Sequence, residues 1–183
     1  MAETHSASTG NRSSPRVVYS ESQIRARVGE LGAAIHSSVD PEDELLLVGL
    51  LKGSFVFLAD LARAIHRPLE VDFLQVASYG SGTESSGTVE LIHDVRTSLN
   101  GRVVVIVEDI IDTGTTLQWL RPRLEGRGPK RLEICSLLHK GMVELNPPAR
   151  WVGFQAPDEF LVGYGLDHAE AYRHLPYVGA LET

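Results

Sequence analysis

The chain has 183 residues, of which 43% are hydrophobic and 22% are charged. This length and composition predict one soluble globular domain that can bury a core without disulfides or metal ions. Its 24 acidic and 17 basic side chains leave a net charge of −7. This negative charge argues against binding of nucleic acid or anionic lipid through bulk electrostatics, although it does not exclude a local basic site.

Cys135 is the only cysteine, so no disulfide can form within the chain. It lies in the apolar run LEICSLL and is expected to pack as a small hydrophobe. No apolar run approaches membrane-spanning length, and the lack of disulfides is typical of a reducing cytosol. We therefore expect a cytoplasmic protein with no membrane partner. The polar residues 1–15 are expected to form a disordered leader, and residues 16–183 a single domain.

The first half of the chain begins with a strong helix signal. Ser20 and Gln23 form a candidate capping box ahead of apolar residues at helical spacing. The continuous apolar run over residues 44–51 predicts a strand buried on both faces. FVFLADLARAI then predicts a helix that ends before Pro68, and LEVDFLQVAS predicts a second strand.

The second half continues this alternation. Residues 79–88, YGSGTESSGT, are nearly all small or polar, which is typical of a solvated hairpin tip or a mobile flap. VELIHDV predicts a strand, Asn100-Gly101 a turn, and RVVVIVED the clearest strand of all. TTLQWLRPRLEG predicts the next helix, with Pro122 either kinking it or ending it early. KRLEICSLLHK, RWVGFQA and FLVGYGLD predict the remaining strands.

Apolar strands that alternate with helices indicate an α/β fold around a parallel sheet. The strands crowd together after Glu133 without long helices between them. This crowding predicts a smaller subdomain at one edge of the sheet.

The stretch VVVIVEDIIDTGTTL, residues 103–117, carries the strongest functional signal. Ligands of open parallel sheets bind at the carboxyl ends of the strands, where Glu108 and Asp109 are expected. The small hydroxyl residues that follow lie between strand and helix, where exposed amides favour an anion. Acids beside an anion site suit a divalent cation or sugar hydroxyls. The stretch therefore predicts a phosphorylated ribose with Mg²⁺ nearby, and the alternative is a solvated turn with capping threonines.

VEDIIDTGTT resembles the phosphoribosyl pyrophosphate (PRPP) motif of type I phosphoribosyltransferases, in its hypoxanthine-guanine form. LLKGSF resembles that family's pyrophosphate loop, SYGSGTESSGTVEL its flexible lid, and LLHK with FLVGYGLD its purine-binding segments. The resemblance covers roughly residues 18–181. It implies a parallel sheet flanked by helices, with a small hood formed by the N-terminal and C-terminal segments.

The resemblance also implies a reaction: a purine-salvage transfer of 5-phosphoribose from PRPP to N9 of hypoxanthine or guanine, giving IMP or GMP and pyrophosphate. Mg²⁺ is the implied cofactor, and a homo-oligomer, either dimer or tetramer, is the implied assembly. An acid at Asp112 favours a 6-oxopurine over adenine, because relatives that use adenine or orotate carry a small residue there.

The resemblance assigns roles to individual residues. Glu108 and Asp109 are implied to hold the ribose 2- and 3-hydroxyls and Mg²⁺, and Asp112 is implied as the general acid/base at N7. The residues implied to bind the 5-phosphate of PRPP are Thr113, Gly114, Thr115 and Thr116. For pyrophosphate they are Lys52, Gly53 and Arg173, for the lid Ser78 and Tyr79, and for the purine Lys140, Phe160, Leu161 and Asp167. Asp167 is also an implied metal contact. The family often holds a cis peptide before the position of Lys52, and Ser54 is expected either to join the site or to cap the next helix.

Two alternatives to this function stay open from the sequence. One is a xanthine-preferring relative, since main-chain carbonyls do much of the recognition at the purine 2-position. The other is a regulatory protein on the same fold that binds RNA. The acidic net charge and Asp112 both disfavour RNA binding.

Overall fold

The computed structural model describes residues 14–79, 88–141 and 145–181. Most of the predicted leader and the centre of the predicted lid therefore lie outside the described residues. The elements are β1 (Arg16–Tyr19), α1 (Glu21–Ser38), β2 (Leu45–Leu51), α2 (Phe55–Ala64), β3 (Glu70–Tyr79), β4 (Thr88–His93), β5 (Val103–Ile111), α3 (Thr115–Glu125), β6 (Arg131–His139), β7 (Trp151–Gln155), β8 (Leu161–Val162) and β9 (Val178–Ala180).

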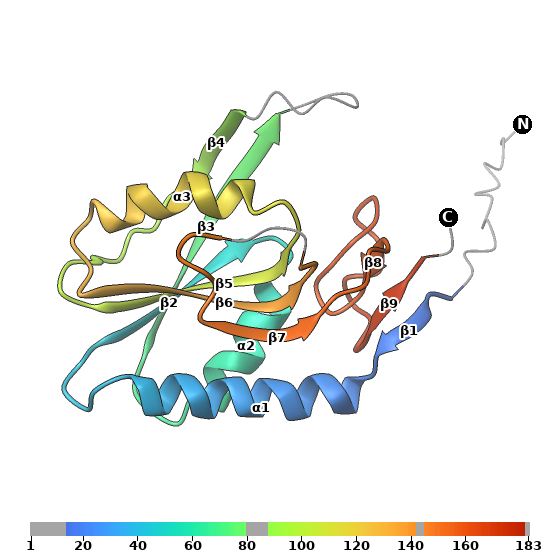
Figure 1. Ribbon diagram of the computed structural model, residues 1–183, viewed down its shortest axis with the longest axis horizontal. Coiled ribbons are helices and arrows are strands. Elements are labelled where there is room, and N and C mark those ends of the chain that lie inside the picture. The colour runs from blue at the N-terminus through green and yellow to red at the C-terminus, as the bar shows by residue number, and fades with distance from the viewer. Residues whose placement is uncertain (1–13, 80–87, 142–144, 182–183) are drawn as a thin grey trace, which may run out of the picture.

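The main sheet has six strands in the order β4-β3-β2-β5-β6-β7. Every neighbouring pair in it is parallel except β3 and β4, which are antiparallel at one edge. Helices α1 and α2 cover one face and α3 covers the other (Figure 1). The predicted α/β architecture around a mostly parallel sheet is confirmed.

A second, three-stranded sheet joins the two ends of the described chain in the order β1-β9-β8. Its strands are antiparallel, and Ala180 lies opposite both Arg16 and Leu161. Figure 1 shows this small sheet beyond the carboxyl ends of β5, β6 and β7. The small sheet therefore borders the edge of the main sheet where ligands of parallel sheets bind.

Strands β6 and β7 correct one expectation from the sequence. They were expected in a smaller subdomain, but both extend the main sheet in parallel, with Cys135 opposite Trp151. The run over β6 is buried along most of its length, so it pairs with β5 as an interior strand. Of the strands after Glu133, only β8 and β9 lie in the small sheet.

The core has two apolar layers, one on each face of the main sheet. Alternate residues of β2 supply both layers: Leu47 packs with α1 and α2, whereas Leu46 and Val48 pack under α3. This arrangement confirms the strand predicted to be buried on both faces. Cys135 is fully buried in the first layer, as its apolar surroundings predicted.

The helix boundaries follow local signals and packing. Ser20 and Gln23 form the predicted capping box at the start of α1. Helix α3 does not end early at Pro122. It continues to Glu125, and Leu124 is buried on its apolar face. None of the helices in the described part of the chain combines the length and apolarity that crossing a bilayer requires.

The two glycines of α1 make a matched test of how tightly α1 packs on α2. A Cβ on Gly32 would lie 2.6 Å from the Ala64 carbonyl oxygen, whereas a Cβ on Gly29 would have no atom within 4 Å. We expect Gly32→Ala to lower the free energy of unfolding by about 1–3 kcal/mol through overpacking. Gly29→Ala should raise it by roughly 0.5–1 kcal/mol, because alanine is the better helix residue. Urea unfolding measures both, and equal effects would contradict the close helix contact.

Candidate functional site

The two acids of β5 lie where this strand has separated from β2. The last residue pair between β2 and β5 is Gly49 with Val107, but β5 continues beside β6 to Ile111. The prediction that the strand ends at Glu108 and Asp109 is therefore wrong, because pairing with β6 extends it. Both acids still lie beyond the last residue pair of β2 and β5, towards the carboxyl edge of the sheet.

Both acids are largely removed from water. Burial, and then the charge of Asp109, raises the pKa of Glu108 well above its ordinary value. Within the described chain, Oε2 of Glu108 is buried without a hydrogen-bond partner. Burial also raises the pKa of Asp109 to about 6; its main-chain hydrogen bonds and Arg173 oppose the rise, and Asp167 adds to it. Desolvated carboxylates of this kind favour a cation or a hydroxyl donor as partner.

The loop after β2 packs against these acids through its main chain. The Leu51–Lys52 peptide is cis, as in the family that the sequence resembles. A Cβ on Gly53 would lie 1.8 Å from Oδ2 of Asp109, so only glycine fits there. Gly165 has φ 100°, and a Cβ on it would lie 2.1 Å from the Gly53 carbonyl oxygen. Three segments that are distant in sequence therefore stack without intervening side chains.

Arg173 contacts the segment that contains Gly165 and Asp167. Its Nη2 lies 2.7 Å from Oδ1 of Asp167, and its Nη1 donates to the Gly165 carbonyl at 2.8 Å. Lys52 forms an ion pair of 3.0 Å with Glu170, and this hydrogen bond lowers the pKa of Glu170. Glu170 was not predicted from the sequence. The only sequence signal for it is its position between Asp167 and Arg173, which were both predicted.

The hydroxyl loop lies at the start of α3. Gly114, with φ 70°, is the residue immediately before the helix. The hydroxyls of Thr113 and Thr115 are 3.0 Å apart. A small pocket of about 90 Å³ lies here, and Glu108 and Asp112 are among the residues that line it. The four predicted loop residues also line it: Thr113, Gly114, Thr115 and Thr116. Free amides at a helix N-terminus together with hydroxyls suit an anion such as phosphate.

A larger cavity of about 430 Å³ brings the remaining motifs together. The predicted residues that line it are Lys52, Gly53, Asp109, Asp112, Lys140, Phe160, Leu161, Asp167 and Arg173. Nζ of Lys140 lies 3.5 Å from Oδ2 of Asp112 and 3.9 Å from Asp158. The ring of Phe160 is 47% exposed and meets His168 edge-on. The cavity and the small pocket share Asp112, so they are adjacent parts of one site.

Other predicted residues fall outside this assembly. Ser78 and Tyr79 end β3, and their side chains, like residues 80–87, are outside the described part of the chain, so the lid stays a prediction. Ser54 neither joins the site nor caps α2 with its side chain. Its buried hydroxyl instead donates to the Leu50 carbonyl at 2.5 Å, so both expectations for it are wrong.

Sequence reasoning missed several residues that line the cavity. Gln75 and Val76 come from β3, and Glu159 precedes Phe160. Glu159 forms an ion pair with Arg16 of β1, which joins the two ends of the described chain. The sequence offers no signal for this contact, because it depends on the pairing of β1 with β9.

Comparisons with known proteins agree with these motifs. The model of the phosphoribosyl transferase domain matches residues 18–169. A hypoxanthine phosphoribosyltransferase of Salmonella typhimurium is 50% identical over 165 residues, which cover 89% of this chain and 93% of that protein. A hypoxanthine-guanine phosphoribosyltransferase of Dictyostelium discoideum is 44% identical and covers 92% of this chain and 96% of its own. The crystal structure of a hypoxanthine phosphoribosyltransferase from Staphylococcus aureus superposes with a TM-score of 0.85 at 42% identity and covers 91% of each chain.

The chain therefore belongs to the phosphoribosyltransferase family. Within that family its similarity is to enzymes named hypoxanthine and hypoxanthine-guanine phosphoribosyltransferase. The resemblance and the type I fold predicted from four short motifs are both confirmed.

The contact between Gly53 and Asp109 can be tested with a second pair of glycines. Gly53→Ala would force the Asp109 carboxylate away from its place, since the new Cβ would lie 1.8 Å from Oδ2. A misplacement of about 1 Å at a reacting site costs about a hundredfold, so we expect that loss in kcat/KM for PRPP. Gly126→Ala, at the end of α3, meets its nearest atom at 3.4 Å and should leave kcat/KM unchanged. Near-parental kinetics of Gly53→Ala would contradict the role of this contact.

Proposed function

We propose that the protein transfers 5-phosphoribose from PRPP to N9 of hypoxanthine or guanine and releases pyrophosphate. The observation that carries this proposal is the single cavity of about 430 Å³ to which the acid, pyrophosphate and purine motifs all contribute. The identity of 50% to a hypoxanthine phosphoribosyltransferase supports the choice of base. Residues 16–183 act as one domain in this proposal, with the small sheet as a hood over the site.

PRPP binds across both parts of the site. The desolvated carboxylates of Glu108 and Asp109 accept hydrogen bonds from the ribose 2- and 3-hydroxyls. The 5-phosphate occupies the small pocket of about 90 Å³ at the start of α3. There the amides and hydroxyls of Thr113, Gly114, Thr115 and Thr116 donate to its oxygens.

The pyrophosphate end of PRPP lies at the loop after β2. The amide of Gly53 and the cations of Lys52 and Arg173 stabilise the negative charge that grows on pyrophosphate as the bond to ribose breaks. Both cations are already held by carboxylates, Lys52 by Glu170 and Arg173 by Asp167. This arrangement fixes their positions before the substrate arrives, so little reorganisation is needed during the reaction.

The acids fit Mg²⁺ as a cofactor that arrives with PRPP. Glu108 carries a buried unpartnered oxygen, and the raised pKa of Asp109 reflects burial together with the nearby charge of Asp167. Within the described part of the chain, no three acidic, histidine or cysteine side chains are close enough to form a metal cage. This donor set suits Mg²⁺, which usually takes one or two carboxylates and completes its shell with substrate oxygens and water. Bound Mg²⁺ would supply charge stabilisation to the pyrophosphate oxygens.

The purine lies at the other end of the cavity. Lys140 donates to the 6-oxo group, Phe160 stacks on the ring, and the Leu161 carbonyl accepts from the 2-amino group of guanine. Asp112 faces N7 and takes up the proton that the purine must lose as N9 attacks. The distance of 3.5 Å between Lys140 and Asp112 supports these two roles, because O6 and N7 lie on the same edge of a 6-oxopurine.

The oligomeric state and the cellular compartment of the protein are also part of this proposal. The assembly is inferred from the family resemblance, since relatives form dimers or tetramers. We therefore expect a homo-oligomer, either dimer or tetramer. The single buried cysteine suits a reducing compartment, so we place the protein in the cytoplasm.

A spectrophotometric assay with PRPP and Mg²⁺ tests the proposed function directly. The assay compares hypoxanthine, guanine, xanthine and adenine as acceptors. We expect turnover with hypoxanthine and guanine and none with adenine, because adenine offers no 6-oxo acceptor to Lys140. A higher kcat/KM for xanthine than for hypoxanthine would identify the protein as a xanthine-preferring relative instead. Binding of RNA without transferase activity would refute the proposal.

Asp112 and Asp109 can be separated by their kinetic effects. Asp112→Asn keeps the size of the side chain but cannot accept a proton, so the single-turnover rate should fall about 10²–10⁴-fold with the KM for PRPP nearly unchanged. Asp109→Asn should mainly raise the KM for PRPP or the Mg²⁺ requirement, since it weakens an interaction formed before the chemical step. If Asp112→Asn keeps a near-parental single-turnover rate while Asp109→Asn abolishes chemistry at saturating PRPP, the two roles are reversed.

A further inference from the structure

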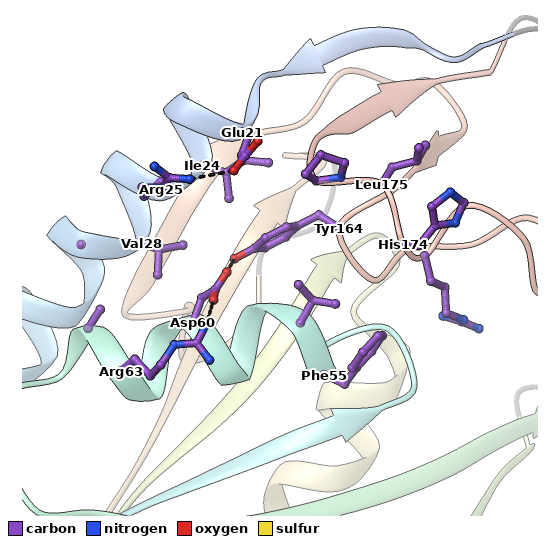
Figure 2. Close-up of a pocket in the computed structure, with 15 residues that line it drawn as sticks. Glu21, Ile24, Arg25, Val28, Phe55, Asp60, Arg63, Tyr164, His174 and Leu175 are labelled. Atoms are coloured by element: carbon purple, nitrogen blue, oxygen red, sulfur yellow. Dashed lines mark hydrogen bonds and ion pairs between the residues drawn. The ribbon is translucent and has the colours of Figure 1, made fainter.

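Tyr164 forms a hydrogen bond that joins the purine-binding segment to α2. Its hydroxyl donates to Oδ2 of Asp60 at 2.6 Å, and the side chain is only 6% exposed. Figure 2 shows the ring reaching from its loop to α2, where Asp60 also pairs with Arg63. Burial, and then the hydrogen bond to Asp60, raises the pKa of Tyr164, so the hydroxyl keeps its proton as a donor.

This bond connects two segments that already meet at the site. Helix α2 starts at Phe55, directly after the loop of Lys52 and Gly53, so Asp60 is rigidly linked to that loop. Tyr164 immediately precedes Gly165, whose main chain packs on the Gly53 carbonyl. The same two segments are therefore held at two points, one of main-chain contact and one of side-chain hydrogen bonding.

The Tyr164 segment also carries the arginine proposed for pyrophosphate. The amide of Gly165 donates to the Arg173 carbonyl at 3.0 Å, and Nη1 of Arg173 donates back to the Gly165 carbonyl at 2.8 Å. The amide of Tyr164 donates to the Leu175 carbonyl at 2.8 Å. A shift of Tyr164 would therefore move Arg173 relative to Gly53.

Core packing and the hydrogen bond together hold the Tyr164 ring, which belongs to the buried layer against α1 and α2. Tyr164, Asp60 and Arg63 line a cavity of about 850 Å³ between α1, α2 and the residues after Arg173 (Figure 2). Packing restrains the ring without fixing the position of its hydroxyl. The hydrogen bond to a carboxylate, which is stronger than one between neutral groups, fixes that hydroxyl on α2.

We propose that Tyr164 and Asp60 are positioning residues for the pyrophosphate end of PRPP, through their hold on the spacing between Gly53 and Arg173. This inference rests on the proposed transfer from PRPP. It adds a pair of residues that touch neither substrate nor metal in that proposal. Their effect should fall mainly on PRPP and pyrophosphate. Lys140 lies on another segment, after β6, and Phe160, four residues before Tyr164, is held separately by the Leu181 amide, which donates to its carbonyl at 3.0 Å.

Tyr164→Phe removes only the hydroxyl and keeps the ring. We expect the KM for PRPP and the inhibition constant of pyrophosphate to rise roughly tenfold, which corresponds to about 1.4 kcal/mol. The KM for hypoxanthine should stay within about twofold, a change of well under 1 kcal/mol. Asp60→Ala should give the same pattern, and the double variant should be no worse than either single one, since both remove one interaction.

Two further variants separate positioning from a general loss of stability. Asp60→Asn keeps a carbonyl oxygen that accepts from Tyr164, so it should restore the KM for PRPP to near the parental value. Tyr19→Phe removes another tyrosine hydroxyl, which donates to the Gln155 carbonyl outside the proposed binding residues. It should lower the unfolding temperature without changing either KM.

The outcomes are distinct. A Tyr164→Phe enzyme with a lower unfolding temperature but a parental KM for PRPP would overturn the positioning role. If Tyr164→Phe does not fold, Asp60→Ala decides by the same criterion. A parent protein without transferase activity would overturn the proposed function, and this inference with it. An active parent with unchanged Tyr164→Phe and Asp60→Ala kinetics would overturn this inference alone.

Discussion

The close approach of Gly53 to the Asp109 carboxylate is the contact on which the site depends. No side chain can stand between them, because a Cβ on Gly53 would lie 1.8 Å from the carboxylate oxygen. Gly165 makes a second close approach, in which a Cβ would lie 2.1 Å from the Gly53 carbonyl oxygen. The loop after β2 is thereby held against both Asp109 and the segment that carries Arg173. The ion pair of Lys52 with Glu170 is a further contact between the loop after β2 and the segment that carries Arg173.

The electrostatics of the site depend on the same packing. At this edge of the sheet Glu108 and Asp109 are shielded from most of the solvent, which raises the pKa of both. Desolvated carboxylates cost stability in the free protein, and a bound cation or sugar hydroxyls would offset that cost. Arg173 already offsets part of it, since its charge opposes the rise in the pKa of Asp109.

Sequence reasoning was most successful where the signal is local. The capping box at Ser20, the doubly buried strand β2 and the loop of small hydroxyls all depend on residues within a few positions of one another. It failed where a distant partner decides the outcome. Strand β5 continues past its acids because β6 pairs with it, and the Ser54 hydroxyl turns back to the Leu50 carbonyl instead of capping α2.

By itself, the sequence determined the α/β class and the family and predicted the residues of the site, because each of these depends on contiguous motifs with a fixed order. Only the tertiary structure decided which of these residues meet and which unpredicted ones join them. Glu170 reaches Lys52, and Tyr164 reaches Asp60, across more than a hundred residues of chain. Contacts of this kind leave no local pattern, since they exist only after β-strand pairing and helix packing have brought the loops to one edge of the sheet.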